Sequence, residues 1–256
     1  MGVTTKFSTG DTVYVPSRLL PDPESAPFAL TRAKVLGQQA RTIRIDRQDE
    51  HLNDISVASR NVHGNNLGLL ILRIGDLRTE DGTLDPLAKS VMHYLRLLLE
   101  PDHVLMREVR TSVELQHVWA EREPALSHVV LIGHGSEDAI KLMDCSLPVG
   151  GKDFAGMLED AVPTTKPKVF LSLSCLTGRQ PFAKPFSEAA VCADYLAPFQ
   201  SVHSAAASLF AQSFFANHLL NAMGTIAAYR RARLAVGSGV SYRHWRNGSL
   251  TPTESS

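Results

Sequence analysis

Hydrophobic residues follow two different patterns along the chain, one in the first 65 positions and another from Leu67 onward. In the first part, short runs alternate apolar and polar residues and are separated by turn residues and prolines. A period of two is typical of strands with one buried face. This part is therefore predicted to be all-β, with strands at residues 12–15, 33–36, 42–46 and 54–58.

From Leu67 onward, nearly uninterrupted apolar runs alternate with segments whose apolar residues recur at helical spacing. Uninterrupted runs are typical of strands that are buried on both faces, as in a parallel sheet. The predicted strands are residues 67–74, 104–109, 129–133, 168–174 and 190–196. The predicted helices are residues 85–99, 113–121, 151–162, 205–223 and 225–236. This alternation predicts an α/β fold with a mostly parallel sheet and helices on both faces.

The change of pattern predicts two domains, residues 1–65 and residues 66–256, joined by a polar linker at residues 61–66. Four or five short strands within about 55 residues are typical of a small β-barrel. The segment Gly10-Asp11-x-Val13-x-Val15 resembles the opening of SH3-like or KOW-like barrels. We expect a small SH3-like barrel in front of the larger domain, where it would bind a regulatory protein partner.

Composition narrows the classes of function. Of the 256 residues, 44% are hydrophobic, which provides enough apolar area for a sizeable core. The 26 Lys and Arg residues balance 26 Asp and Glu residues, so the basic surplus of a nucleic-acid binder or a polybasic membrane binder is missing. The polar start lacks the features of a secretory signal, no apolar run is long enough to span a membrane, and three cysteines form no disulfide framework. A cytoplasmic protein is expected.

Two strand ends carry residues that could do chemistry. His134 follows the strand at 129–133, and Cys175 follows the strand at 168–174. The carboxyl ends of parallel strands meet at one edge of a sheet, where α/β proteins bind their ligands. A thiol within hydrogen-bond reach of an imidazole is the minimal machinery for covalent acyl transfer. Taken singly, such a cysteine is usually a small core residue and such a histidine a loop residue, but their matching positions favour a catalytic pair.

These residues carry a resemblance to the caspase-like cysteine peptidases of clan CD, and most closely to their CHAT branch. An apolar strand ends in His134-Gly135, and a second ends in Cys175, with Thr177-Gly178 two residues on. The order of the following elements, up to about Trp245, also resembles the family. The resemblance implies a caspase-like sheet, a nucleophile at Cys175, a general base or orienting histidine at His134, and an oxyanion site made by the backbone amides of Gly135 and Cys175. It further implies an endopeptidase in regulated proteolysis, as in prokaryotic antiviral defence or cell death.

The resemblance leaves open which residue the substrate presents at P1. Relatives that cleave after basic residues have an acidic residue just before the cysteine, where this chain has Leu173 and Ser174. A pocket for an acidic P1 residue would need an arginine. Arg73, at the end of the first strand of the larger domain, is therefore a candidate substrate-pocket residue.

The other chemistry-bearing residues favour structural roles. Cys192 lies inside a predicted strand, Cys145 at a turn, and His203 before a predicted helix. The histidines and cysteines lack the spacing of a zinc site, and no glycine motif for nucleotides is present, so neither a metal nor a cofactor is predicted. Two alternatives to a peptidase remain. One is a non-catalytic caspase-like scaffold or interaction protein, and the other is a different hydrolase that uses Cys175 on amide or ester substrates.

Overall fold

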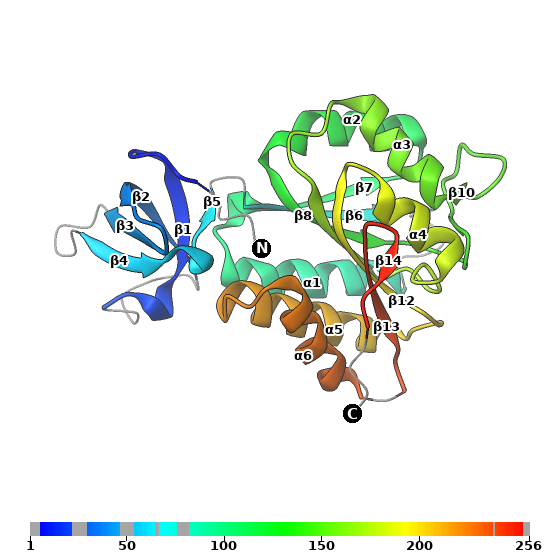
Figure 1. Ribbon diagram of the computed structural model, residues 1–256. Coiled ribbons are helices and arrows are strands. Elements are labelled where there is room, and N and C mark those ends of the chain that lie inside the picture. The colour runs from blue at the N-terminus through cyan, green and yellow to red at the C-terminus, as the bar shows by residue number, and fades with distance from the viewer. Residues whose placement is uncertain are drawn as a thin grey trace.

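The computed structural model describes residues 6–21, 30–46, 54–64, 67–75, 82–237 and 239–252. It contains a small antiparallel sheet followed by a larger, mostly parallel sheet that lies between two layers of helices. The small sheet stands beside one end of the larger α/β part (Figure 1). The α/β fold expected from the alternation of strands and helices is therefore confirmed.

The first part of the chain forms a five-stranded antiparallel sheet with the strand order β4-β3-β2-β1-β5. All four predicted strands are present. Their alternating sequences place one side of each strand in a small apolar core that includes Val13, Ile43 and Val57. The strands are β1 (Thr12–Pro16), β2 (Leu30–Gln38), β3 (Thr42–Asp46), β4 (Ile55–Ala58) and β5 (His63–Gly64).

The linker predicted at residues 61–66 is wrong at His63 and Gly64. These two residues are strand β5, which pairs with β1, while residues 65 and 66 lie outside the described residues. A strand of two residues has too few positions to show an alternating pattern. Its sequence therefore cannot be distinguished from that of a polar loop.

The larger sheet has seven strands in the order β14-β13-β12-β11-β8-β6-β7. The five strands from β12 to β7 are parallel, and β13 and β14 pair antiparallel at one edge. The chain order of the parallel strands reverses between β6 and β8, which is where open α/β sheets form a crevice. The strands are β6 (Gly68–Ile74), β7 (Val104–Val109), β8 (Leu126–Ile132), β11 (Lys168–Ser172), β12 (Cys192–Pro198), β13 (Tyr242–Arg246) and β14 (Ser249–Leu250).

Helices cover both faces of the larger sheet (Figure 1). Successive strand residues point to opposite layers, so that Val130 belongs to one core and Val129 to the other. This explains why each strand is an uninterrupted apolar run. One layer consists of α1 (Leu84–Leu98), α5 (Ser204–Phe215) and α6 (Thr225–Val236), and the other of α2 (Ser112–Arg122), α3 (Gly151–Ala161) and α4 (Gln180–Glu188).

Several elements of the larger part differ from the sequence prediction. Helix α4 was not predicted because it contains Pro185 and a second proline in its first turn, and proline usually marks a break. The strands β13 and β14, which follow the last predicted helix, were not predicted. The helix predicted at 205–223 is α5 only as far as Phe215, and a π-helical turn, Ala216–Leu220, follows it.

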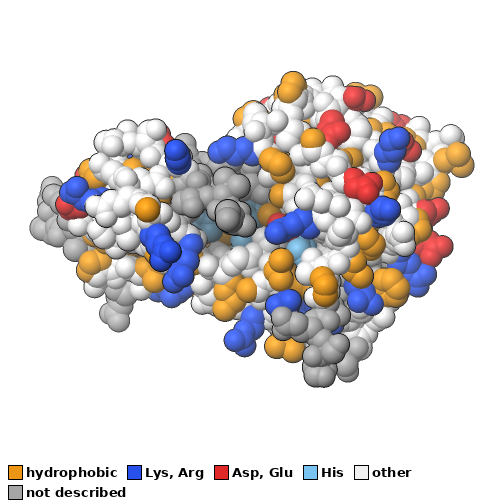
Figure 2. Space-filling view, in the orientation of Figure 1, with side chains coloured by type: hydrophobic (Ala, Val, Ile, Leu, Met, Phe, Trp, Pro, Cys, Tyr) orange, Lys and Arg blue, Asp and Glu red, His pale blue; other side chains and the backbone are white. Residues whose placement is uncertain are grey.

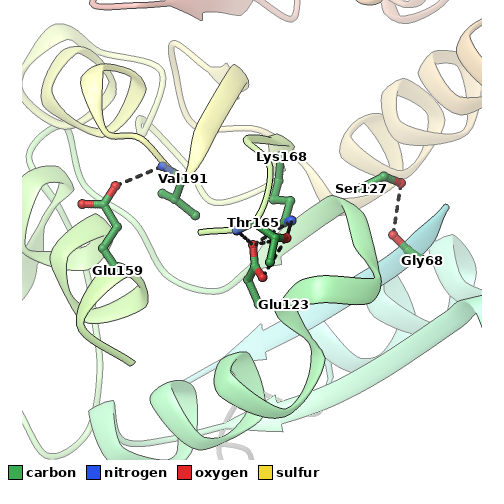
Figure 3. Close-up of polar contacts among 7 residues, drawn as sticks. All are labelled: Gly68, Glu123, Ser127, Glu159, Thr165, Lys168 and Val191. Carbon is green, nitrogen blue, oxygen red and sulfur yellow. Dashed lines mark hydrogen bonds and ion pairs between the residues drawn. The ribbon is translucent and has the colours of Figure 1, made fainter. Parts of the chain in front are cut away.

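A buried ion pair fixes the amino end of β11, the strand that leads to Cys175 (Figure 3). Lys168 Nζ lies 2.8 Å from Glu123 Oε1, and both side chains are fully buried. Thr165 donates to the same carboxylate from its backbone N–H at 2.9 Å and from its hydroxyl at 3.0 Å. Burial by itself raises the pKa of Glu123, but Lys168 and Thr165 outweigh burial and hold that pKa below its usual range.

The small sheet packs directly against the larger part. The Tyr14 hydroxyl lies 2.6 Å from His103 Nε2, and Arg18 Nε donates to Leu220 O at 2.8 Å. Tyr14 and Leu30 belong to a core cluster of the larger part and not to the core of the small sheet. The two parts of the chain therefore share buried apolar surface.

Candidate active site

His134 and Cys175 follow neighbouring strands of the larger sheet. β8 and β11 are adjacent and parallel, with Leu131 opposite Ser172, and Leu173 N donates to Leu131 O at 2.8 Å just beyond that pair. Both strands therefore end at the same edge of the sheet. His134 and Cys175 each come three positions after the Leu131–Ser172 pair, and paired strands lie only about 4.8 Å apart.

The loop after β8 is in direct contact with the loop after β11, and glycine makes this approach possible. A Cβ atom on Gly135 would lie 2.7 Å from Cys175 O and 2.6 Å from Thr177 Cγ2. A Cβ atom on Gly133 would lie 2.7 Å from Ile74 O, at the end of β6. These separations are too short for a side chain, so the backbones can approach only because both residues are glycine.

His134 opens a tight hairpin at this edge. Lys141 N donates to His134 O at 3.2 Å, and Ser136 N donates to Ala139 O at 2.8 Å. The short strands β9 (Ala139–Ile140) and β10 (Val149–Gly150) continue the segment and pair antiparallel. The imidazole of His134 is exposed. The histidine is therefore presented at the surface by a backbone that is fixed on both sides.

The turn that carries Cys175 is closed by hydroxyl groups beneath it. The Thr177 hydroxyl donates to Ser174 O at 2.9 Å and so accepts the hydrogen bond from the Ser172 hydroxyl at 2.8 Å. Ser172 in turn accepts from Ser174 N at 3.2 Å. Leu176 follows the cysteine at φ +65°, a left-handed conformation that is unusual for leucine. The network holds the turn in a conformation that its sequence alone does not favour.

The thiol of Cys175 is half-buried beside Val202, in the segment that leads to α5. Its Sγ accepts from Val202 N at 3.4 Å and lies 3.8 Å from Val202 O. Burial raises the pKa of Tyr242 on β13, and negative charge on Cys175 raises it further. The thiol lies at the end of β11, against the segment that leads to α5.

Two backbone amides at this edge have no hydrogen-bond acceptor among the described residues. Gly135 lies opposite Ile140 in an antiparallel bridge whose two hydrogen bonds are made by the flanking residues. The N–H of Gly135 itself is therefore not used in the hairpin. Neither the Gly135 amide nor the Cys175 amide donates to another described residue. Rigid, unoccupied donors of this kind are what an oxyanion requires.

Arg73 is not brought to an open surface. Its side chain is almost fully buried, with Nη1 3.1 Å from Asp85 Oδ1 and 2.7 Å from Glu108 Oε1. Two carboxylates therefore balance its charge and tie β6 to β7 and to the start of α1. These ion pairs give Arg73 a structural role. Its role in a substrate pocket stays a prediction.

The remaining candidates occupy structural positions. Cys192 lies in the apolar core between the sheet and α4, where burial raises the pKa of its thiol. Burial and the charge of Asp144 raise the pKa of Cys145. His203 caps α5, with Nδ1 accepting from Ala205 N at 3.2 Å. Raised pKa values leave less of the reactive thiolate at Cys145 and Cys192.

Sequence reasoning missed the residues that position the cysteine. Ser172 was predicted only as part of a strand, Thr177 entered only through the family resemblance, and no pattern in the sequence singles out Val202. A signal was present, because Ser172 and Ser174 interrupt an otherwise apolar strand and Thr177 follows within three residues. Buried hydroxyls require partners, and those of Ser172 and Thr177 bond each other and the backbone of Ser174. The Ser174 hydroxyl itself has no hydrogen-bond partner among the described residues. The contact of Val202 joins segments that are 27 residues apart and leaves no local pattern.

No protein-family model matches the chain, and no curated protein is significantly similar to it. Among the described residues, no helix combines the length and the apolar character needed to cross a membrane. In the same part of the chain, no group of three or more His, Cys, Asp or Glu side chains could hold a metal ion.

Proposed function

We propose that this protein is a cysteine endopeptidase of the caspase-like, CHAT type, in which His134 and Cys175 cleave protein substrates. The observation that carries this proposal is the contact between the two loops, where Gly135 lies against Cys175 O and Thr177. The register of β8 against β11 supports it, because it brings both residues to one edge of the sheet. Of the described cysteines, only Cys175 follows the end of a strand next to a loop that carries a histidine.

The position of each group suggests its part in the reaction. His134 would take the proton of the Cys175 thiol, and the thiolate would attack the carbonyl carbon of the scissile peptide bond. The amides of Gly135 and Cys175 would receive the oxyanion. The C–N bond then breaks as His134 gives its proton to the leaving amine, and water hydrolyses the thioester to release the acid and restore the thiol.

Selective alkylation tests the reactivity of Cys175. With substoichiometric iodoacetamide at neutral pH, we expect Cys175 to be labelled before the other thiols, as measured by mass spectrometry of the digested protein. Cys145 and Cys192 are internal controls, because their raised pKa values reduce the thiolate fraction. Labelling of Cys145 ahead of Cys175 in the native protein would count heavily against the catalytic pair.

Substitution of each member tests catalysis. Cys175→Ala and His134→Ala should each abolish cleavage of the natural substrate, and the double variant should be no worse than either, because nucleophile and base act as a unit. Both residues lie outside the packed cores, so folding should lose no more than about 0.5–3 kcal/mol. Cys145→Ala is the matched control and should retain full activity. Cleavage by Cys175→Ala at the wild-type rate, with any activator present, would rule out the assignment.

The regulatory partner, the compartment and the biological role are proposed from the resemblance to the CHAT-type peptidases. The small sheet, closed as an SH3-like barrel, would bind a regulatory protein, and the peptidase would act in the cytoplasm as an effector of prokaryotic defence or cell death. A non-catalytic scaffold is the second candidate. The contact of the Cys175 thiol with both backbone groups of Val202 favours it, since that contact partly covers the sulfur. A Cys175 that resists alkylation in the native protein would select the scaffold.

A further inference from the structure

An aromatic side chain flanked by two arginines lies beyond the carboxyl end of β12. Phe199 is 39% exposed, and the guanidinium carbons of Arg179 and Arg243 lie 5.1 and 4.9 Å from its ring centroid. Arg179 precedes α4, and Arg243 lies on β13 opposite Ala197. We call Phe199, Arg179 and Arg243 the arginine clamp.

The arginine clamp carries more positive charge than its neighbours balance. Arg179 Nη1 pairs with Glu137 Oε2 at 2.8 Å, in the hairpin that begins at His134. Arg243 has no carboxylate within ion-pair distance in the part of the chain that the structure describes, and its Nε is buried without a hydrogen-bond partner there. A buried donor without an acceptor costs free energy, which a bound acceptor would recover.

Helix α6 adds positive charge next to the clamp. The guanidinium carbon of Arg233 lies 5.7 Å from the ring centroid of Tyr229, whose hydroxyl donates to Tyr242 O, directly before Arg243. Burial raises the pKa of Tyr229, while the charges of Arg233, Arg243 and Arg230 act in the opposite direction. Because the whole chain has 26 basic and 26 acidic residues, this surplus is a local feature. Such a surplus attracts anions.

The clamp is continuous with the candidate active site. Gly178 N donates to Pro198 O at 2.9 Å, and Leu176 N lies 3.4 Å from Gln200 O, so the Cys175 turn runs along the segment that carries Phe199. The same segment reaches the thiol at Val202. Val202 follows Phe199 by three positions, so their backbones can lie at most about 10 Å apart. A peptide bound at Cys175 would therefore reach the clamp a few residues from its scissile bond.

We propose that the arginine clamp binds the carboxylate of an Asp or Glu side chain in the polypeptide held at Cys175, a few residues from the bond that is cleaved. The proposal rests on the proposed peptidase function. Guanidinium groups hold carboxylates in a bidentate fashion, and stacking on an aromatic ring orients them before the ligand arrives. A carboxylate is favoured over a nucleic-acid phosphate because the chain as a whole has no net positive charge, whereas nucleic-acid binders usually carry a basic surplus.

Fluorescence anisotropy with a labelled peptide measures the clamp without any catalysis. The protein is Cys175→Ala, and the probes are a fluorescein-labelled dodecapeptide rich in glutamate and its counterpart with glutamine in place of each glutamate. We expect the glutamate peptide to bind at least tenfold more tightly. Arg243→Gln and Arg179→Gln should each weaken it about tenfold, while binding of the glutamine peptide stays unchanged. Arg96→Gln, an exposed arginine on α1, is the matched control.

The outcomes distinguish the clamp from the peptidase. Equal binding of the two peptides, or equal weakening by Arg96→Gln and Arg243→Gln, would overturn the clamp. Tighter binding of a single-stranded oligonucleotide than of the glutamate peptide would also overturn it. Selective glutamate binding together with an unreactive Cys175 in the wild-type chain would keep the anion site and reject the peptidase. A reactive Cys175 without glutamate selectivity would do the reverse.

Discussion

The absence of a side chain at Gly135 decides how closely the loops that carry His134 and Cys175 approach each other. Gly135→Ala would place a Cβ atom 2.6 Å from Thr177 Cγ2 and 2.7 Å from Cys175 O, so the loops must separate. We expect a loss of about 1–3 kcal/mol of stability, as for an overpacked site. A displacement of about 1 Å can cost on the order of a hundredfold in rate. Thermal denaturation and the rate of Cys175 alkylation measure the two effects separately.

A second glycine provides the control for this substitution. Gly156 lies within α3, and a Cβ atom there would meet nothing within 4 Å. Gly156→Ala should therefore stabilise the protein by about 0.5–1 kcal/mol, because alanine loses less backbone entropy in a helix. It should leave Cys175 alkylation unchanged. Equal losses in the two variants would contradict the close contact at Gly135.

Thr177 offers a second test at the scale of one residue, because its hydroxyl both donates and accepts beneath Cys175. Thr177→Val keeps the shape but leaves Ser174 O and the Ser172 hydroxyl with one partner fewer. The expected cost is about 1–3 kcal/mol of stability, with slower Cys175 alkylation. Thr177→Ser keeps the hydroxyl and should restore most of the alkylation rate. Equal alkylation rates in the valine and serine variants would show that the hydroxyl does not position the turn.

Reactive residues are easier to identify from the sequence than the residues that position them. His134 and Cys175 were predicted because apolar strands end directly before them, which is a local signal. Their neighbourhood depends on contacts between segments that are distant in the chain, such as Gly135 with Thr177 and Cys175 with Val202. Arg73 illustrates the same limit. Its pairing with Glu108 follows from the register of β6 and β7, which no local pattern determines.

At the scale of elements, the Lys168–Glu123 pair fastens β11 to the segment before β8. Removing only the lysine, as in Lys168→Met, leaves the Glu123 carboxylate buried with Thr165 as its remaining donor. We expect a loss of about 3–5 kcal/mol, whereas the double variant Lys168→Met/Glu123→Leu should recover much of it. Chemical denaturation measures both. A double variant as unstable as the single one would show that the pair acts through packing alone.

The pair also predicts a pH dependence. Because the folded protein holds the pKa of Glu123 below the unfolded value, the unfolded chain binds the proton more readily as the pH falls. The stabilisation is present above the unfolded pKa of about 4.3 and is lost as the pH falls through the folded value. The wild-type chain should therefore lose more stability than the double variant when the pH is lowered below 4. An equal loss of stability in the two proteins over this pH range would show that the Glu123 carboxylate does not cause the pH dependence.

Elements were predictable where the pattern was long and regular. The five parallel strands have short, nearly uninterrupted apolar runs, and five of the helices have apolar stripes at helical spacing. Helix α4 was missed because two prolines mask its period, although Phe182 and Phe186 bury its apolar face. β13 was missed because its inward residues include His244, whose Nε2 bonds Asp194 Oδ1 at 2.6 Å. A polar residue with a buried partner looks like a surface residue in a sequence.

At the scale of the whole molecule, three histidines cluster where the small sheet meets the larger part. The ring centroids of His128 and His218 are 5.1 Å apart, and those of His63 and His218 are 6.5 Å apart. Histidine side chains, in pale blue, are visible along this junction in Figure 2. Burial, and then the charge of His218, lowers the pKa of His63 to about 4 and that of His128 well below its usual value. Burial also lowers the pKa of His218.

This cluster predicts that mild acid weakens the junction. The imidazoles of His63 and His128 stay neutral in the folded protein below about pH 6.5, where the unfolded chain takes up a proton at each of them. Their contribution to stability is complete above that value and decreases as the pH falls towards 4, by up to about 1.4 kcal/mol per pH unit for each histidine. Denaturation midpoints should therefore fall steeply between pH 6.5 and 4.5, before the carboxylates titrate.

A pair of variants assigns this slope to the junction. In His63→Gln, the group on β5 no longer titrates, so stability should depend less steeply on pH between 6.5 and 4.5 than in the wild-type chain. His93→Gln, at an exposed position of α1, should keep the wild-type slope.

The junction lies at the amino ends of the strands, and the candidate active site lies at their carboxyl ends. Acid should therefore loosen the small sheet first, which hydrogen exchange of β1 and β5 would detect as faster exchange than in β8 and β11. Uniform exchange across both sheets would instead indicate that the two parts unfold as one unit.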